Sequence, residues 1–189
     1  IFEREEKLGG VPRYVIPAFR ISDEAIDKDI ALMEKYGVEV RCGAPAPSVE
    51  ALKKQGYTHI LIATGAWKAG RLDIPGNVKG VIGWMKEMKQ QVKPCLEGHV
   101  VVVGAGNTAM DAARVAKRMG AASSTIVYRR TKKEMPADEH ELKLAIDEGV
   151  NLVELAAPVE QKDGRLICNQ MKLGEPDASG RRSPVATGE

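Results

Sequence analysis

The sequence predicts an α/β fold built on parallel strands, and three patterns within residues 99–130 lead to that prediction. Residues 100–103 are an unbroken run of valine, as expected of a parallel strand buried on both faces. The next six residues read Gly-Ala-Gly-Asn-Thr-Ala and fit the pattern G-x-G-x-x-A. A helix over residues 110–119, C-capped by Gly120, and a second strand over residues 124–128 follow. This order is typical of a Rossmann-like unit.

The glycine turn predicts a phosphate-binding site. Its glycines allow a tight turn and let a pyrophosphate approach the backbone, while a small third residue permits close helix–strand packing. The helix that follows presents N–H groups and a partial positive charge, both of which favour phosphate. An ordinary tight turn in a βαβ unit is the alternative, but it would not need glycines and a basic pair at one sheet edge. The residues predicted to bind the dinucleotide are Gly104, Ala105, Gly106, Asn107, Thr108 and Ala109.

Two arginines at the end of the second strand predict which dinucleotide is bound. Arg129 follows Gly104 by 25 residues, close to the roughly 20 residues at which such sites contact the adenosine ribose. An acid there binds the 2′-hydroxyl of NAD, whereas arginine accommodates the 2′-phosphate of NADP. Guanidinium hydrogen bonds of about 1.5–3 kcal/mol each favour NADPH over NADH. Arg129 and Arg130 are therefore predicted to bind NADPH, with Lys133 adding charge, and a solvated turn over residues 129–133 is the alternative.

Local patterns predict the remaining elements. A helix over residues 21–36 has Ser22 as its N-cap and an apolar stripe that ends before Gly37. Before the glycine turn we also expect a strand over 38–42, a helix over 48–55, a strand over 57–63, a loop over 67–80, a helix over 84–92 and a linker over 93–98. After it we expect a turn at Pro136, a helix begun by Asp138, a β meander with strands 152–155, 159–162 and 166–173, and a loop or hairpin tip over 174–189.

The composition is that of an ordinary globular protein. The 189 residues are 43% hydrophobic and 29% charged, with a net charge of +2, so neither nucleic acid nor a membrane is expected as a partner. No apolar run approaches the ~18–20 residues of a spanning helix. The cysteines form no C-x-x-C pair, which disfavours a dithiol centre or an iron–sulfur cluster in this segment and predicts no metal site. Three is an odd number for a disulfide framework, which favours a reducing cytoplasm. The three cysteines are Cys42, Cys95 and Cys168.

Four stretches resemble one family along nearly the whole chain. Together they are similar to the NADPH-dependent flavoprotein subunit of glutamate synthase, and to related modules of dihydropyrimidine dehydrogenase and of a bacterial subunit assigned to selenate reduction. The stretches are Leu-Gly-Gly-Val-Pro-Arg-Tyr at 8–14 with Ile-Pro-Ala-Phe-Arg at 16–20; Ile-Ala-Thr-Gly-Ala at 62–66; the glycine turn through Tyr128-Arg129-Arg130 to Met135-Pro136; and Gly174-Glu175-Pro176-Asp177 with Gly180-Arg181-Arg182.

The resemblance implies a two-dinucleotide flavoprotein fold in which an NADPH domain is inserted into a split FAD domain. Residues 1–97 would be a partial FAD-binding domain, and residues 98–189 a Rossmann-like NADPH-binding domain with a C-terminal β meander. We expect the chain to be a fragment of such a protein, because the FAD fingerprint and the closing FAD segment are missing from it. By resemblance, the FAD contacts would be Glu3, Gly10, Val11, Arg20, Ala46, Thr64 and Gly65.

The resemblance further implies an NADPH-dependent FAD oxidoreductase. Hydride would pass from NADPH to FAD, and electrons would leave through iron–sulfur clusters in a partner domain or subunit that also holds the terminal acceptor site. The isolated fragment would be inactive. We predict no catalytic side chain, since the flavin supplies the chemistry, and His59, His99 and His140 are interpreted as structural or exposed. An NADP-binding module without its own activity and a direct NADP-dependent dehydrogenase are alternatives, while a disulfide reductase is disfavoured by the missing C-x-x-C.

Overall fold

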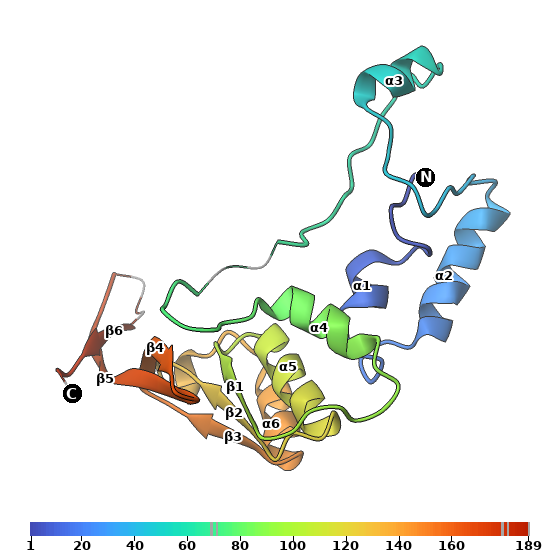
Figure 1. Cartoon of the computed structure of the whole chain (residues 1–189). Helices are drawn as coiled ribbons and strands as arrows, with labels where there is room; N and C mark the ends of the chain where they lie inside the picture. Colours follow the sequence, from blue (N-terminus) through green and yellow to red (C-terminus); the bar gives the residue numbers. More distant parts are fainter. Residues whose placement is uncertain (69, 71, 179, 181, 189) are drawn as a thin grey trace. The chain divides into compact units, whose positions relative to one another are not determined.

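The chain divides into two compact units, residues 1–69 and residues 70–189 (Figure 1). The computed structural model describes residues 1–68, 70, 72–178, 180 and 182–188, so Arg181 of the family resemblance lies outside the described residues. The division between the compact units falls at residues 69/70 of the sequence, whereas the domain boundary predicted from the sequence lies at 97/98. The assignment of residues 1–97 to a FAD-binding domain and of residues 98–189 to an NADPH-binding domain stays a prediction.

The described residues of the first unit form three helices, and the two longer ones confirm the sequence prediction. Helix α2 spans Asp23–Lys35 and helix α3 spans Val49–Lys54. Each begins after a serine N-cap whose hydroxyl accepts a hydrogen bond from a backbone N–H in the first turn, at 3.2 Å in both cases. The short helix α1, Gly10–Tyr14, was not predicted.

The two strands predicted in the first unit are wrong. Residues 57–63 run without strand pairing, and Leu61 and Ile62 are 90% and 72% exposed. Residues 38–42 contribute only one isolated bridge, between Arg41 and Phe2. A strand exists only where a neighbour takes its backbone hydrogen bonds, and among the described residues no ladder partner lies beside residues 57–63. An apolar β-branched pattern alone therefore over-predicted strand here.

A parallel sheet forms the centre of the second unit. Its strands β1 (His99–Val103), β2 (Ser123–Val127) and β3 (Val150–Val153) lie in that order. Helices α5 (Asn107–Arg118) and α6 (Glu139–Asp147) pack against this sheet (Figure 1). Helix α5 begins earlier than the predicted 110–119, so residues of the glycine pattern form its first turn. The core beneath the turn contains Ala105, Met110, Ala113, Ile126, Tyr128, Ala145 and Val150.

Two predictions about this sheet need correction. The valine strand is not buried on both faces: β1 is an edge strand, and Val101 and Val103 remain 44% and 37% exposed. The segment predicted as the first strand of the meander, residues 152–155, instead contributes to β3, which pairs in parallel with β2. The reason is the intervening helix α6, which returns the chain to the same end of the sheet as a parallel crossover requires.

An antiparallel sheet follows, in the order β4-β5-β6. Strands β4 (Ala156–Lys162) and β5 (Arg165–Pro176) are joined by the predicted Asp163-Gly164 turn, where both residues have positive φ. Both strands are longer than predicted, and β6 (Arg182–Ala186) makes the C-terminal region a hairpin. Helix α4 (Val81–Lys89) lies earlier than the predicted 84–92, and a 3-10 turn, η1, spans Lys132–Glu134.

Candidate dinucleotide-binding site

The glycine turn lies at the carboxyl end of β1. Gly104 has φ of 124°, a conformation that side chains rarely adopt, and its N–H donates to the Val127 carbonyl at 3.0 Å. No described atom comes within 4 Å of the position that a Cβ would occupy at Gly104 or Gly106. The backbone is therefore open on this side, which suits the close approach of a pyrophosphate.

Helix α5 begins directly at this turn without a side-chain cap. Gly106 is its N-cap and provides no side-chain acceptor, and the first turn contains no acidic residue. Ala109 and Met110 are buried, which fixes the helix against the sheet. The N-terminal N–H groups and the positive end of the helix dipole are thus held in place for an anion.

Residues 135–138 fold back onto the glycine turn. The Ala137 N–H donates to the Ala105 carbonyl at 3.1 Å, and the Asp138 N–H donates to Oδ1 of Asn107 at 3.1 Å. The Asp138 carboxylate in turn caps α6 through the N–H of His140 at 2.8 Å. The Asn107 side chain thus serves a tertiary contact that sequence reasoning missed, while Thr108 is exposed and Ala109 packs as a small residue should.

The two predicted arginines have different surroundings. Arg129 is exposed, whereas Arg130 is only 8% exposed, and its Nε is buried without a hydrogen-bond partner among the described residues. Burying a charged donor without a partner is unfavourable. An anion would satisfy this donor with a charge-assisted hydrogen bond. The Arg130 site therefore fits a phosphate group, and both arginines leave the same sheet edge as the glycine turn.

The basic turn, residues 128–133, is well ordered by local hydrogen bonds. The Tyr128 hydroxyl donates to the Glu134 carbonyl at 2.8 Å, and Thr131 and Glu134 form a capping box around η1. The Thr131 hydroxyl, 2.5 Å from the Glu134 carboxylate, lowers the pKa of that carboxyl. Lys133 is exposed on this turn, so its charge faces solvent near the two arginines.

Some of the predicted FAD contacts gather near the N-terminus. The Glu3 N–H donates to the Arg41 carbonyl at 2.9 Å, and the Glu3 carboxylate accepts from the Glu5 N–H at 2.9 Å. The Arg4 guanidinium lies 5.1 Å from the centroid of the Trp67 ring, which brings the segment after Thr64 and Gly65 to the same region. Ala46 is exposed just beyond Ala44, whose N–H donates to the Glu3 carbonyl at 3.3 Å.

The other predicted FAD contacts belong to the region of α1. Gly10 and Val11 begin that helix, and the Arg20 N–H donates to the Pro17 carbonyl at 2.9 Å. Gly9 has φ of 123°, and a Cβ there would lie 2.9 Å from Cβ of Arg13. Gly9 is therefore explained by the packing of a neighbouring side chain, whereas Gly10 has a φ of 51° and no described atom within 4 Å of a Cβ position.

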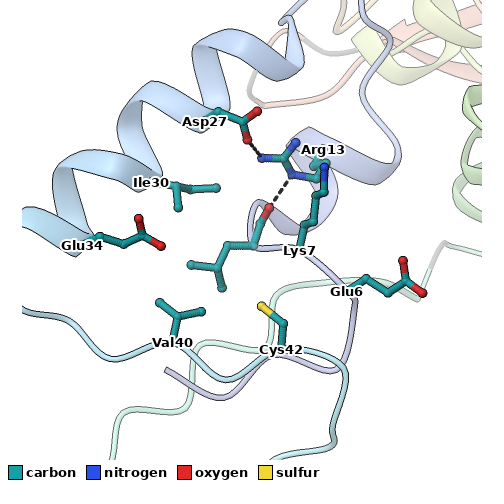
Figure 2. A pocket seen from close by; sticks show the side chains of 9 residues that line it. Glu6, Lys7, Arg13, Asp27, Ile30, Glu34, Val40 and Cys42 are labelled. Atoms are coloured by element: carbon teal, nitrogen blue, oxygen red, sulfur yellow. Dashed lines mark hydrogen bonds and ion pairs between the residues drawn. The ribbon is translucent and has the colours of Figure 1, made fainter.

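That side chain, Arg13, is a buried residue that sequence reasoning missed. It forms one wall of a cavity of about 230 Å³ in the first unit (Figure 2). Its Nε donates to the Leu8 carbonyl at 2.5 Å and its guanidinium pairs with Asp27, and with Asp23 at 3.9 Å. The arginine inside the Gly-Gly-Val-Pro-Arg stretch was the available signal. The cavity lining contains none of the predicted FAD contacts: it is Glu6, Lys7, Leu8, Arg13, Asp27, Ile30, Glu34, Val40 and Cys42.

The described part of the chain holds neither a metal-binding cluster nor a membrane-spanning helix. There, no three His, Cys, Asp or Glu side chains gather as a metal ion would require. No helix in the same residues is both long and apolar enough to cross a membrane. All three cysteines carry unpaired thiols, and burial raises the pKa of the half-buried Cys168 thiol.

These features define the class of the second unit: a Rossmann-like unit whose glycine turn and basic turn lie at one edge of a parallel sheet. The chain belongs to the pyridine nucleotide-disulphide oxidoreductase family, whose sequence profile matches residues 14–176. Family membership agrees with the predicted α/β fold. The matched region lacks a C-x-x-C pair, so disulfide chemistry does not follow from the family name.

Curated relatives confirm the resemblance to NADPH-dependent flavoprotein subunits. The chain is 44% identical over its whole length to YgfK of Escherichia coli K12, a protein named as a candidate oxidoreductase. It is 38% identical over 93% of its length to the NADPH-Fe(3+) oxidoreductase subunit beta of Geobacter sulfurreducens, and 30% identical over 97% to the glutamate synthase [NADPH] small chain of Azospirillum brasilense. The chain spans only 19%, 28% and 43% of these three proteins, respectively.

A solved structure supports the fold. FprA from Mycobacterium tuberculosis, determined in complex with NADPH, matches all of the chain and 60% of its own length with a TM-score of 0.80. At 18% sequence identity this likeness shows the fold alone.

Proposed function

We propose that the second unit binds NADPH and that, as part of a longer flavoprotein, it presents the nicotinamide for hydride transfer to FAD. The observation that carries this proposal is the buried Arg130 guanidinium, whose Nε has no partner among the described residues, at the same sheet edge as an open glycine turn. A dinucleotide with an extra 2′-phosphate would satisfy both features at once.

The residues of this chain would act by binding and orientation. Backbone N–H groups at the start of α5 would hold the pyrophosphate, and Arg130, with Arg129 and Lys133 nearby, would hold the 2′-phosphate. When bound, the nicotinamide and the flavin would supply the redox chemistry themselves. Hydride transfer between them needs no side-chain acid or base, so we propose no catalytic residue.

The FAD contacts belong to the proposal as well. A carboxylate accepts several hydrogen bonds, so the single one from Glu5 leaves Glu3 with capacity for a ribose hydroxyl. Ala46, Thr64 and Gly65 would lie near the same cofactor. Gly10, Val11 and Arg20, in the region of α1, would contact another part of it.

Electrons would then pass to iron–sulfur clusters in a partner domain or subunit that holds the terminal acceptor site. The names of the relatives support a partner subunit, because they include a beta subunit and a small chain, both parts of larger assemblies. We place the protein in the cytoplasm, since its unpaired thiols suit a reducing compartment.

Calorimetric titration of the purified chain with NADPH, NADH and FAD tests the proposal. We expect tight binding of NADPH and at least tenfold weaker binding of NADH, because only NADPH carries the 2′-phosphate. Equal affinities for the two nucleotides would contradict the assignment of the basic turn. Gly104→Val would fill the open side of the turn, so loss of NADPH binding in this variant would locate the site. Gly180→Ala, between β5 and β6, is the control.

A second candidate is a nucleotide-binding module without redox activity of its own. It is favoured by residues 57–63, which form no strand in the described structure although a flavin-binding sheet would need one there. NADPH binding without FAD binding in the same titration would support this candidate.

A further inference from the structure

The basic turn is held from one side by the corner between β3 and β4, residues 153–156. The Tyr128 N–H donates to the Val153 carbonyl at 2.9 Å, and the Ala156 N–H donates to the Tyr128 carbonyl at 3.1 Å. The Leu155 N–H donates to the Arg130 carbonyl at 3.1 Å. Three backbone hydrogen bonds from one short corner thus set the path of the chain through both arginines.

The corner itself has an unusual backbone. Leu155 has φ of 56°, in the left-handed region that disfavours a leucine. This conformation turns its N–H toward Arg130, while its carbonyl accepts from the Met171 N–H of β5 at 2.8 Å. A disfavoured conformation persists only where the surrounding structure enforces it, and such residues cluster at functional sites.

One further contact between corner and basic turn depends on a side chain. The Lys132 N–H donates to Oε1 of Glu154, so this exposed carboxylate satisfies an N–H at the start of η1 that the turn itself leaves unpaired. A negative charge beside a phosphate-binding segment opposes anion binding. Glu154 therefore favours nucleotide binding by ordering the basic turn, but opposes it through its negative charge.

We infer that Glu154 is a positioning residue for nucleotide selection: by holding Lys132 it keeps Arg129 and Arg130 where they distinguish NADPH from NADH. This inference rests on the proposed function. It assigns the selectivity to a carboxylate that would not contact the nucleotide and that sequence reasoning gave no role.

Three variants separate geometry from charge. Glu154→Ala removes both the acceptor and the charge, Glu154→Gln keeps an acceptor but removes the charge, and Glu97→Ala removes a charge from the linker at the opposite end of β1. NADPH and NADH affinities of the full chain are measured by calorimetry at fixed ionic strength. A thermal melt of each variant reports whether the fold is retained.

We expect Glu154→Ala to weaken NADPH binding about three- to tenfold, the effect of losing one hydrogen bond that orders the site, and to change NADH binding less than twofold. Glu154→Gln should restore the wild-type preference, and Glu97→Ala should keep it. Tighter NADPH binding in Glu154→Ala would overturn the inference, because only the charge would then matter. Equal losses for NADPH and NADH would overturn it too. Wild-type protein that fails to distinguish the nucleotides would instead overturn the proposed function, and with it this inference.

Discussion

Arg129 and Arg130 are adjacent and chemically identical, yet the fold gives them different surroundings. Arg129 faces solvent, where a guanidinium is hydrated and screened, whereas Arg130 is buried with an unpaired Nε. An interaction with an exposed charge weakens as salt is added, while one with a buried charge is screened much less. The two side chains should therefore contribute to nucleotide binding in measurably different ways.

We expect Arg130→Ala to weaken NADPH binding about ten- to a hundredfold, as loss of a charge-assisted hydrogen bond predicts. Arg129→Ala should weaken it by less than about fivefold. Calorimetry at about 0.05 M and 0.5 M salt measures how each loss of NADPH affinity depends on salt. The loss in Arg130→Ala should be the same at both concentrations, whereas the loss in Arg129→Ala should become smaller at the higher one. Losses of the same size and salt dependence would show that the burial difference has no functional effect.

At the scale of elements, the contact between α5 and α6 depends on a cluster of charged side chains. The nearly buried Arg114 and the half-exposed Arg118 both bind Glu148, at 2.6 and 2.7 Å. Hydrogen bonds from Arg118 and then from Arg114 lower the pKa of Glu148 from 4.5 to about 2. Because α5 begins at the glycine turn, this cluster also stabilises the helix that would bind the pyrophosphate.

Replacing Glu148 should destabilise the second unit. We expect Glu148→Gln to lower the free energy of unfolding by about 1–3 kcal/mol at neutral pH, because the nearly buried Arg114 loses the charge of the nearer of its two carboxylate partners and keeps only Glu141, at 3.8 Å, as an ion-pair partner of this cluster. Asp147→Asn, which breaks the exposed pair with Lys143, is the control and should cost under about 0.5 kcal/mol. Urea unfolding of both variants measures the difference, and equal effects would contradict the role of the cluster.

The same cluster predicts a pH dependence. The Glu148 carboxyl titrates at a lower pH in the folded chain than in the unfolded chain, so the unfolded chain binds more protons between the two pKa values. Its contribution is complete above the unfolded pKa of 4.5 and is lost as the pH falls toward about 2. Wild-type protein should lose stability over this window more steeply than Glu148→Gln. Parallel curves would show that another group controls the acid transition.

Sequence patterns predicted the elements whose signals are local. The helices begun by Ser22, Ser48 and Asp138 and the turn at Asp163-Gly164 lie where capping and turn chemistry placed them. Pairing between distant segments was not predictable, because a strand signal names no partner. For that reason residues 57–63 were wrongly predicted as strand and β3 was assigned to the wrong sheet. The site was predicted by residue type, but the Arg130 carbonyl accepts a hydrogen bond from a corner some 25 residues later in the chain, and no local pattern reveals this contact.

At the scale of the whole molecule, we expect the two compact units to differ in their resistance to local unfolding. Among the described residues, the second unit has two sheets and a cluster of packed core residues, whereas the first unit has three helices, separate buried residues such as Ile26 and Leu52, and long segments without ladder hydrogen bonds. Leu61, at 90% exposed, lies in one of these segments. Local unfolding of such exposed backbone costs little free energy, so proteases cleave it preferentially.

Limited proteolysis should therefore cut first within residues 57–68. We expect chymotrypsin at low ratio to cleave near Tyr57 or Leu61 and to leave a resistant product that contains the second unit. Mass spectrometry identifies the cut. Added NADPH should protect that product further but not the cut segment, since the proposed site lies entirely in residues 104–133. First cleavage inside α5 or β2 would contradict this order of stability.

The unpaired donor of Arg130 also has a practical consequence for the choice of buffer. Inorganic phosphate and sulfate carry the same oxygens as the 2′-phosphate, so each would act as a weak competitor at that position. A competitor that binds only the folded state raises its apparent stability in proportion to RT ln(1 + [L]/Kd). Melting temperatures measured in phosphate should therefore exceed those in a zwitterionic buffer of equal pH and ionic strength, while NADPH affinities should be lower. The Arg130→Ala variant should show a smaller difference between the two buffers, because the anion site at that position has lost its buried donor.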